Sequence, residues 1–424
     1  AEARERDAQL NRGENSGWMH GFPHAIKDLE ATKGIRTTMG SPILKHWVPE
    51  TDTILVDRIR RAGAILIGKT NTPEFGLGSH TFNPVFGTTV NAYDQTRGAG
   101  GSSGGAAVAL ALRMLPVADG SDHAGSLRTP AAYNNVLGFR TCYGRAPGDW
   151  RDAFGPSLAV AGPMARTIED LAMLLSVIAG YDPRLPLSIR QDPLRFAEPL
   201  KRDFKGARVA WLGDFGGYLP FEPGVLEVCR GALRRLENLG CVVEEAAPDY
   251  PIARVWENWL KLRASQVGAI LREFYVDPAR RALMKPEAQW EVENGFKLSA
   301  YDIAQAGAVR SEWYQAVRRC FERFDFMVLP SAQVFPFEAS IRWPQEISGR
   351  AMDTYHRWME VMIPVTMSGC PALNLPAGFS SNGLPMGIQL IGPNHAEMNC
   401  LQLGYAYEQA CEDLFERRPA LLGK

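Results

Sequence analysis

Short apolar runs and amphipathic stretches follow one another along most of the chain. Apolar runs bounded by glycine, proline or charge predict strands at 21–28, 64–67, 115–118, 136–144, 208–212, 241–244 and 326–329. Apolar residues at helical spacing predict helices at 51–62, 106–115, 167–180, 223–239, 254–275, 299–324 and 396–414. Strands alternating with helices in this way indicate an α/β fold with a large mixed β-sheet surrounded by helices.

Three local signals refine this prediction. The segments 371–379 and 386–391 flank Asn382-Gly383, which is typical of a β-hairpin. Thr167 is expected to cap the helix that follows it. The stretch 208–244 has the pattern of an αβ unit that could form a second domain, but we expect it to join the same large sheet.

Two glycine- and serine-rich runs, residues 98–105 and 119–126, flank the apolar segment 106–118. A helix followed by a strand can bring these two runs together. Glycine is needed where the backbone turns sharply or approaches a ligand closely. Serine hydroxyls on two converging loops are suited to acyl transfer, so this region is the predicted active site.

Composition excludes several classes of partner. The 424 residues carry a formal net charge of -1, so neither nucleic acid nor an anionic membrane is an expected partner. The seven cysteines are scattered, odd in number and without a C-x-x-C pair, which indicates reduced thiols in a cytoplasmic protein and no zinc site. The polar N-terminus is not a secretory signal and lacks Met, so we expect a trimmed fragment. The longest apolar run, 106–117, is interrupted by Arg113 and is too short to span a bilayer.

Three patterns compete as the source of the chemistry. The first is residues 63–70, GAILIGKT, which match the phosphate-binding pattern G-x-x-x-x-G-K-[ST]. That pattern requires a loop of small or polar residues, whereas its four middle residues here, 64–67, form a predicted strand. The context therefore disfavours nucleotide binding.

The second pattern is residues 101–105, GSSGG, which match the G-x-S-x-G nucleophile elbow of an α/β-hydrolase esterase with Ser103 as nucleophile. An elbow follows a strong strand, but residues 91–100 are polar and glycine-rich. His356 and His395 could complete a triad, although neither has a distinctive context.

The third pattern combines Ser126 as nucleophile, Ser102 as bridging hydroxyl and Lys27 as base. A lysine, with an ordinary pKa of about 10.4, acts as a base at neutral pH only where burial disfavours its charged form. Lys27 follows the apolar run 22–26, which provides such a setting. The structural alternative is a surface lysine paired with Asp28 and serines that merely form turns.

The two serine runs resemble the signature of the amidase signature family of serine hydrolases. The family's GGSSGG loop appears at 100–105, its D-x-G-G-S-x-R-x-P-A loop appears at 122–131, and their key serines are 24 positions apart, as the family pattern requires. The segments GFPHAIKDLEATKG, GKTNTPEF and GCPALNLPAGFSSNGLPMGIQLIGP match as well. Residues 185–325 match loosely, so the resemblance implies one amidase-signature domain over 1–424 with 185–325 as a variable region.

The resemblance implies a Ser–cis-Ser–Lys triad and an acyl-enzyme intermediate. Neutral Lys27 would take a proton from Ser102, Ser102 would take the proton of Ser126, and Ser126 would attack the carbonyl carbon. A cis peptide bond is expected before Ser102, and neither a metal nor a cofactor is implied. The expected oxyanion hole consists of the backbone N–H groups of His123, Ala124, Gly125 and Ser126.

Three residues depart from the family pattern. Ala124 stands where glycine is usual, and its Cβ is expected to narrow the acyl pocket and to strain a positive φ. His123 replaces an aliphatic residue and is expected either to touch substrate or to face solvent. Ala92 replaces a proline, with little expected effect.

The sequence defines the substrate less closely than the reaction. We expect the loop 76–86, with His80 and Phe82, and the segment 343–367 to wall the pocket. The further residues expected to contact substrate are Gly100 and Gly101.

Expected substrates are small-molecule amides, aryl amides, esters and carbamates. A resemblance of the D-H-A-G-S loop to urethane-cleaving members makes carbamates a specific hypothesis. We expect a monomer or homodimer without a glutamine-tRNA partner. The alternative from another class is a catalytically inactive family member that serves as a binding subunit.

Overall fold

The computed structural model describes residues 1–149, 152–155 and 157–423. The largest sheet formed by these residues has eight strands and lies at the core of the fold. The strands are β5 (Val117–Asp122), β6 (Leu137–Arg140), β7 (Val160–Ala165), β8 (Arg208–Trp211), β9 (Val242–Glu245), β10 (Phe326–Pro330), β13 (Ala372–Phe379) and β14 (Pro385–Ile391). Their order across the sheet is β5–β7–β6–β13–β14–β10–β8–β9. The β10–β8 and β8–β9 pairs are parallel and the others antiparallel. The predicted large mixed sheet is confirmed, and β8 and β9 join it as expected.

Helices cover both faces of this sheet. On β13, Asn374 faces the side of Ala132, whereas Leu373 and Leu375 face the side of Gly404, which places α4 and α12 on opposite faces. The α-helices are α1 (Glu2–Asn11), α2 (Ile54–Arg61), α3 (Gly104–Ala111), α4 (Arg128–Tyr133), α5 (Ile168–Ile178), α6 (Val225–Asn238), α7 (Ile252–Tyr275), α8 (Pro278–Arg281), α9 (Pro286–Gly295), α10 (Ala300–Cys320), α11 (Ile363–Ser368), α12 (Glu397–Ala410) and α13 (Glu412–Phe415). Five 3-10 helices among the described residues lie at Pro42–Leu44, Glu74–Gly76, Pro193–Ala197, Arg357–Met362 and Ala420–Leu422.

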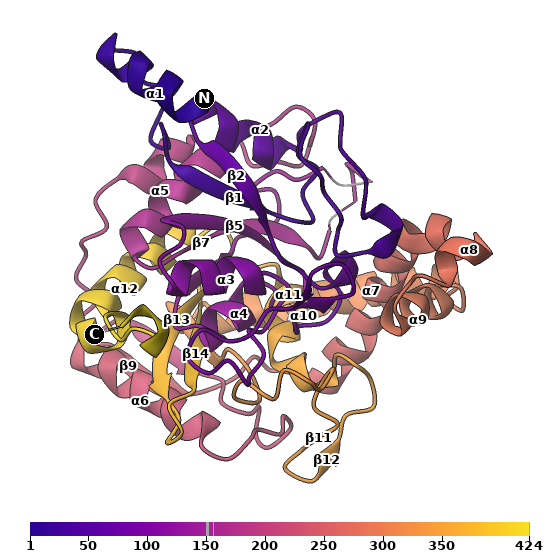
Figure 1. The fold of residues 1–424 in the computed structure, drawn as a ribbon. Coiled ribbons are helices and arrows are strands. Elements are labelled where there is room, and N and C mark those ends of the chain that lie inside the picture. The colour runs from indigo at the N-terminus through magenta and orange to yellow at the C-terminus, as the bar shows by residue number, and fades with distance from the viewer. Residues whose placement is uncertain (150–151, 156, 424) are drawn as a thin grey trace.

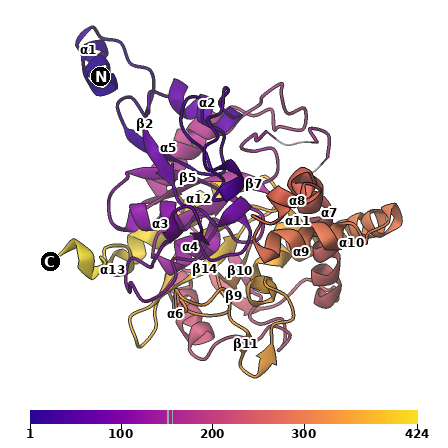
Figure 2. The same ribbon diagram turned by 45° about the vertical axis from the view of Figure 1, so that its right-hand side comes forward.

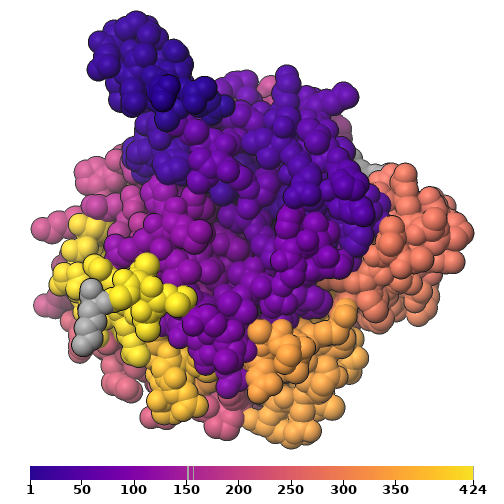
Figure 3. All heavy atoms as spheres, viewed as in Figure 1, coloured from indigo at the N-terminus to yellow at the C-terminus, as the bar shows by residue number. Residues whose placement is uncertain are grey.

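The helices α7, α9 and α10 pack together beside the sheet rather than on it (Figure 2). In the space-filling view, α8 and α9 stand out on the right and α1 projects at the top (Figure 3). No side chain of α1 is buried, because the helix has hardly any apolar residues with which to dock. The charged N-terminal segment is therefore helical but makes little contribution to the core.

A separate two-stranded parallel sheet carries Lys27. It consists of β1 (Pro23–Lys27) and β2 (Ile65–Thr70) and lies beside β5 (Figure 1). The carboxylate of Asp119 on β5 joins the two sheets, because it accepts the backbone N–H of Lys27 at 3.1 Å and lies 3.0 Å from His24 Nε2. The strand predicted at 64–67 is present as part of β2, but it is not buried as expected, since Ile67 is 60% exposed.

Local signals in the sequence were mostly confirmed. Thr167 accepts the backbone N–H of Asp170 at 3.2 Å and caps α5, and β13 and β14 form the expected hairpin. Several elements were missed, among them α4, α9, α11 and β7. The sequence of β7, VAGPMA, contains glycine and proline. Because β7 pairs with β5 along its whole length, residues 119–122 are strand and not loop as predicted.

Two short strand pairs lie outside the large sheet. They are β3 (Phe82–Asn83) with β4 (Gly87–Thr88), and β11 (Glu346–Ile347) with β12 (Arg350–Ala351).

All seven cysteines are buried and free. Burial raises the pKa of the Cys370 thiol to about 12. Within the described residues, no helix combines the length and apolarity that crossing a membrane requires.

Candidate active site

The first serine run wraps tightly around the start of α3. Ser103 is the residue before this helix, and the peptide bond between Gly101 and Ser102 is cis, as the resemblance implied. A Cβ on Gly101 would lie 2.9 Å from Thr81 Oγ1, so the loop can approach its neighbour only because it lacks side chains there. Glycine thus fixes the place of Ser102 through close backbone packing.

The second serine run starts on β5 and ends at α4. Gly120 on β5 lies opposite Gly162 on β7, and Leu127 packs over both. A Cβ on Gly120 would lie 2.5 Å from Leu127 Cδ2 and 2.7 Å from Ser103 Oγ. This pair of strand glycines therefore lets the turn that carries Ser126 settle against the first serine run.

Lys27 lies at the centre of a cluster of hydroxyl groups. Its Nζ is 2.8 Å from Ser102 Oγ, 2.8 Å from Ser103 Oγ and 3.1 Å from Ser121 Oγ. The side chain is completely buried, and burial lowers the pKa of Lys27 from 10.5 to about 8 even though the charge of Asp119 opposes this shift. The surface-lysine alternative is wrong, and the amine has an appreciable neutral fraction near neutral pH.

Ser126 opens into a cavity of about 430 Å³ that Ser102, Ser121 and His123 also line. Ser126 is 7% exposed, whereas Ser103 is completely buried and does not line the cavity. The backbone N–H of Ser103 donates to the Ser126 carbonyl oxygen at 3.1 Å, which ties the two serine runs together. Among the described residues, Ser102 Oγ and Ser126 Oγ share the cavity without a direct hydrogen bond.

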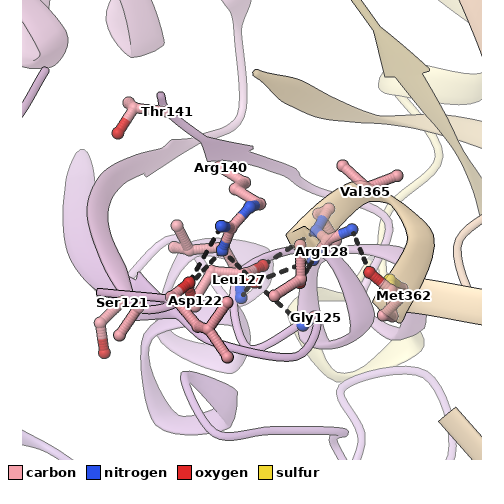
Figure 4. Close-up of polar contacts among 12 residues, drawn as sticks. Ser121, Asp122, Gly125, Leu127, Arg128, Arg140, Thr141, Met362 and Val365 are labelled. Atoms are coloured by element: carbon pink, nitrogen blue, oxygen red, sulfur yellow. Dashed lines mark hydrogen bonds and ion pairs between the residues drawn. The ribbon is translucent and has the colours of Figure 1, made fainter. Parts of the chain in front are cut away.

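A buried ion-pair network holds the turn that carries Ser126 (Figure 4). The carboxylate of Asp122 accepts the backbone N–H groups of Gly125 at 2.9 Å and of Leu127 at 3.2 Å. Arg128 donates to both of its oxygens at 2.9 Å, and Arg140 lies 3.2 Å away. Burial alone would raise the pKa of Asp122, but the two guanidinium groups hold that pKa well below its usual range, so the residue is charged.

Removing this carboxylate is expected to destabilise the fold. In Asp122→Asn, two buried guanidinium groups lose their shared counter-charge, so we expect a loss of about 3–5 kcal/mol in the free energy of unfolding. Chemical denaturation followed by circular dichroism measures this loss. The control is Asp413→Asn, which breaks a 2.8 Å ion pair with Arg235 at the surface and should cost about 1 kcal/mol or less. Equal losses in the two variants would contradict the prediction.

The backbone N–H groups expected to form the oxyanion hole differ in availability. The N–H of Gly125 is engaged by Asp122, whereas no hydrogen-bond acceptor for the N–H groups of His123, Ala124 and Ser126 is found among the described residues. The expected strain at Ala124 is absent, because the positive φ of this turn, +91°, falls on Gly125. Alanine therefore fits at 124 without backbone strain.

His123 faces the cavity, and not bulk solvent. Its ring lies edge-on to Trp259 at 6.2 Å between centroids, and its Nε2 is buried with no partner among the described residues. Burial lowers the pKa of His123 well below 6.5, and the nearby charge of Arg263 adds to this shift. The ring is thus a neutral part of the cavity wall.

The four predicted substrate-contacting residues do not line this cavity. His80 is buried with Nε2 3.1 Å from the Ala339 carbonyl oxygen, and its ring lies 5.1 Å from that of Phe82. Gly100 packs on Pro130, and Gly101 packs on Thr81. None of the four lines this cavity, and their contact with substrate stays a prediction.

The walls of the cavity come largely from residues that sequence reasoning missed. Of the two predicted wall segments, 76–86 contributes Gly76 and Leu77, whereas no described residue of 343–367 lines this cavity. The missed lining residues are Leu29, Glu30, Ala31, Met39, Thr53, Leu55, Phe75, Gly148, Asp149, Ala159, Ala161, Arg263, Val267, Ile270 and Leu271. Proximity to Lys27 was an available signal for Leu29 and Glu30. The sequence carried no such signal for the lining residues of α7, because this helix lies in the region 185–325 that matches the family only loosely.

The competing patterns do not form the sites that they predicted. Residues 65–70 form strand β2, and Lys69 Nζ donates to the Glu30 carbonyl oxygen at 2.6 Å, so no phosphate loop is present at 63–70. Ser103 follows a bend and not a strand. Neither His356, whose Nε2 lies 3.4 Å from Glu291, nor His395, whose backbone N–H donates to Cys142, contacts a serine of the two runs.

Comparisons with known proteins agree on one family. The family model for amidase matches residues 1–401. A glutamyl-tRNA(Gln) amidotransferase subunit of Thermosynechococcus vestitus is 36% identical over 96% of this chain and 88% of that protein, and the Moorella thermoacetica protein of the same name is 37% identical over 99% and 88%.

Two solved structures show the same architecture. A bacterial aryl acylamidase of the amidase signature family has a TM-score of 0.90 at 29% identity, covering 98% of this chain and 89% of that one. The peptide amidase from Stenotrophomonas maltophilia has a TM-score of 0.80 at 25% identity, covering 100% and 88%. The large sheet and its surrounding helices are shared with both.

Proposed function

Since this chain belongs to the amidase family and is a hydrolase of C–N bonds, we propose that it cleaves small-molecule amides with Ser126 as nucleophile, Ser102 as bridge and Lys27 as base. The observation that carries this proposal is the 2.8 Å contact between Lys27 Nζ and Ser102 Oγ, beside a cavity that also holds Ser126. A buried amine with a lowered pKa next to a hydroxyl is the arrangement that nucleophilic catalysis requires.

The proposed reaction proceeds in two halves. Neutral Lys27 accepts the proton of Ser102, Ser102 accepts that of Ser126, and Ser126 Oγ bonds to the carbonyl carbon while the π electrons move onto oxygen. The free N–H groups of His123, Ala124 and Ser126 stabilise this oxyanion. The proton then returns through Ser102 to the leaving nitrogen, the C–N bond breaks, and an amine departs. Water attacks the acyl-enzyme by the same proton path and releases a carboxylic acid.

Small substrates fit this site best. A cavity of about 430 Å³ with apolar walls such as Leu29, Leu55 and Leu271 is suited to an aryl or alkyl amide. The net charge of -1 favours a small molecule over a tRNA-linked substrate, although relatives include glutamyl-tRNA(Gln) amidotransferase subunits A. We therefore propose that the purified chain hydrolyses amides without a partner protein, as a monomer or homodimer.

Carbamates are the narrower form of this proposal. A carbamate presents the same carbonyl and C–N bond as an amide, so it suits the same proton path. The test compares purified protein on matched pairs of aryl amides and aryl carbamates. Hydrolysis of both supports the broad proposal, hydrolysis of amides alone removes the carbamate, and hydrolysis of neither by folded protein favours an inactive binding subunit.

Activity is expected to rise with pH through about 8. Burial lowers the pKa of Lys27 to about 8, and its deprotonated form is the proposed base, so protonation at lower pH removes activity. Between pH 6 and pH 8 we expect kcat/KM to increase about 50-fold and then to level off. A pH–rate profile on a neutral anilide measures this. A profile that is flat from pH 6 to 9 would contradict Lys27 as the base.

A further inference from the structure

Glu30 lines the catalytic cavity, three positions after Lys27. Its backbone is held on both sides, because its N–H donates to the Lys27 carbonyl oxygen at 3.0 Å and its own carbonyl accepts from Lys69 Nζ at 2.6 Å. Thr32 Oγ1 donates to the same carbonyl at 3.0 Å. Glu30 is therefore a fixed part of the cavity wall, and the proposed reaction gives it no role.

The charge of Glu30 is not balanced within the described part of the chain, where no ion pair with its carboxylate is formed. Lys69 is the adjacent cation. Burial lowers the pKa of its ammonium, and the charges of Asp28, Asp119, Glu30 and Asp52 oppose this shift, so Glu30 shares this cation with three other acids. Asp149 lines the same cavity as a further carboxylate. Glu30 therefore has no ion-pair partner of its own among the described residues.

The cation in the cavity lining is already paired. Arg263 Nε lies 2.5 Å from Glu291 Oε1, and Arg263 also donates to the Tyr355 hydroxyl at 3.0 Å. The positive charge of Arg263 is thus neutralised by Glu291. Among the described residues, the cavity lining therefore supplies no free cation to pair directly with Glu30.

The surroundings of Glu30 make this imbalance costly. Leu29, Leu55 and Leu77 line the same cavity, and a carboxylate among apolar groups is unfavourable unless a cation or hydrogen-bond donor pairs with it. Burial accordingly raises the pKa of Glu30, and the charge of Asp119 adds to this shift. A positively charged ligand group would recover the free energy that this desolvation costs.

We propose that the substrates of this site carry a positively charged ammonium or guanidinium group that pairs with Glu30 while the scissile carbonyl group lies at Ser126. This inference rests on the proposed function and defines the substrate class of the same cavity. Glu30 acts as a specificity residue, because it contacts the substrate away from the reacting atoms.

The kinetic test uses pairs of substrates that differ in charge alone. One series compares ω-aminoacyl 4-nitroanilides with alkanoyl 4-nitroanilides in which a methyl group replaces the ammonium group. The other compares 4-(aminomethyl)acetanilide with 4-ethylacetanilide, so that both halves of the substrate are sampled. We expect a cationic member to show a kcat/KM about 10- to 100-fold above that of its neutral partner.

The variant Glu30→Gln should lose this preference, so that its cationic and neutral substrates show the same kcat/KM within about threefold. The charge of Glu30 also raises the pKa of Lys27, so rates are compared at pH 9, where Lys27 is largely neutral in both proteins. The matched control is Glu50→Gln, which removes an exposed carboxylate outside the cavity and should keep the preference. A preference that survives Glu30→Gln overturns the assignment.

A binding measurement keeps this inference separable from the proposed reaction. Calorimetry on the unchanged protein compares n-hexylammonium with 1-hexanol as ligands and requires neither activity nor a variant. Tighter binding of the ammonium supports the inference, and equal binding of the two overturns it. If the protein hydrolyses neutral anilides and does not prefer the cationic ones, the inference about Glu30 fails and the proposed function stands. If it hydrolyses no anilide at all, only the proposed function fails.

Discussion

The Ser126→Ala variant is expected to lose amide hydrolysis by about five orders of magnitude or more, as do other enzymes deprived of a serine nucleophile. Ser126 is the serine of the two runs that combines access to the cavity with neighbouring free backbone N–H groups. Steady-state kinetics on a 4-nitroanilide measures the loss. Intact mass after treatment with a fluorophosphonate, followed by peptide mapping, should place a single adduct on Ser126 and show none in the variant.

The matched control for this variant is Ser103→Ala. Ser103 Oγ also lies 2.8 Å from Lys27 Nζ, but the side chain is buried away from the cavity. We therefore expect a loss of about tenfold or less, from a less firmly held lysine. An adduct on Ser103, or a larger loss in Ser103→Ala than in Ser126→Ala, would assign the nucleophile to the elbow pattern instead.

The Lys27→Met variant is expected to lose about 10³- to 10⁴-fold in kcat, because it removes the base but keeps a side chain of similar length in a buried site. Its pH–rate profile should also lose the rise through about pH 8 that the lowered pKa of Lys27 produces. Kinetics over pH 6 to 9.5 measures both effects. Fluorophosphonate labelling of Ser126 should slow in parallel, since the same proton transfer activates the serine.

Lys285 provides the control, because it shares the pKa of Lys27 without sharing its contacts. Burial lowers the pKa of Lys285 to about 8, yet its Nζ donates to the Leu77 carbonyl oxygen at 2.6 Å and contacts neither serine run. Lys285→Met should therefore retain the rise with pH. If Lys285→Met loses the rise in activity with pH and Lys27→Met keeps it, the assignment of Lys27 as the base is refuted.

The proposed reacting groups could be predicted from the sequence because short segments with a recognisable pattern carry them. The spacing of Ser102 and Ser126, the glycines around them and the apolar run before Lys27 are all local, and the structure brings the three residues to one place. The cis peptide bond at Ser102 followed from the resemblance and is present.

The cavity walls were not predictable in the same way. Arg263, Ile270 and Leu271 lie more than a hundred positions from Ser126, on a helix whose sequence pattern shows a buried face without showing what it covers. His80 and Phe82 have the composition of a pocket wall, but aromatic residues serve equally well in packing, and here they pack behind the first serine run. Strand β7 was missed because its glycine and proline obscure the usual strand pattern.

The proposed base and nucleophile belong to different sheets, since Lys27 ends β1 of the small sheet and Ser126 follows β5 of the large one. Lys27 leaves the ribosome about a hundred residues before Ser126, and chains fold progressively as they emerge. The proposed proton path therefore forms only once both segments have emerged and the two sheets have packed together, with the Asp119 carboxylate accepting the backbone N–H of Lys27 between them.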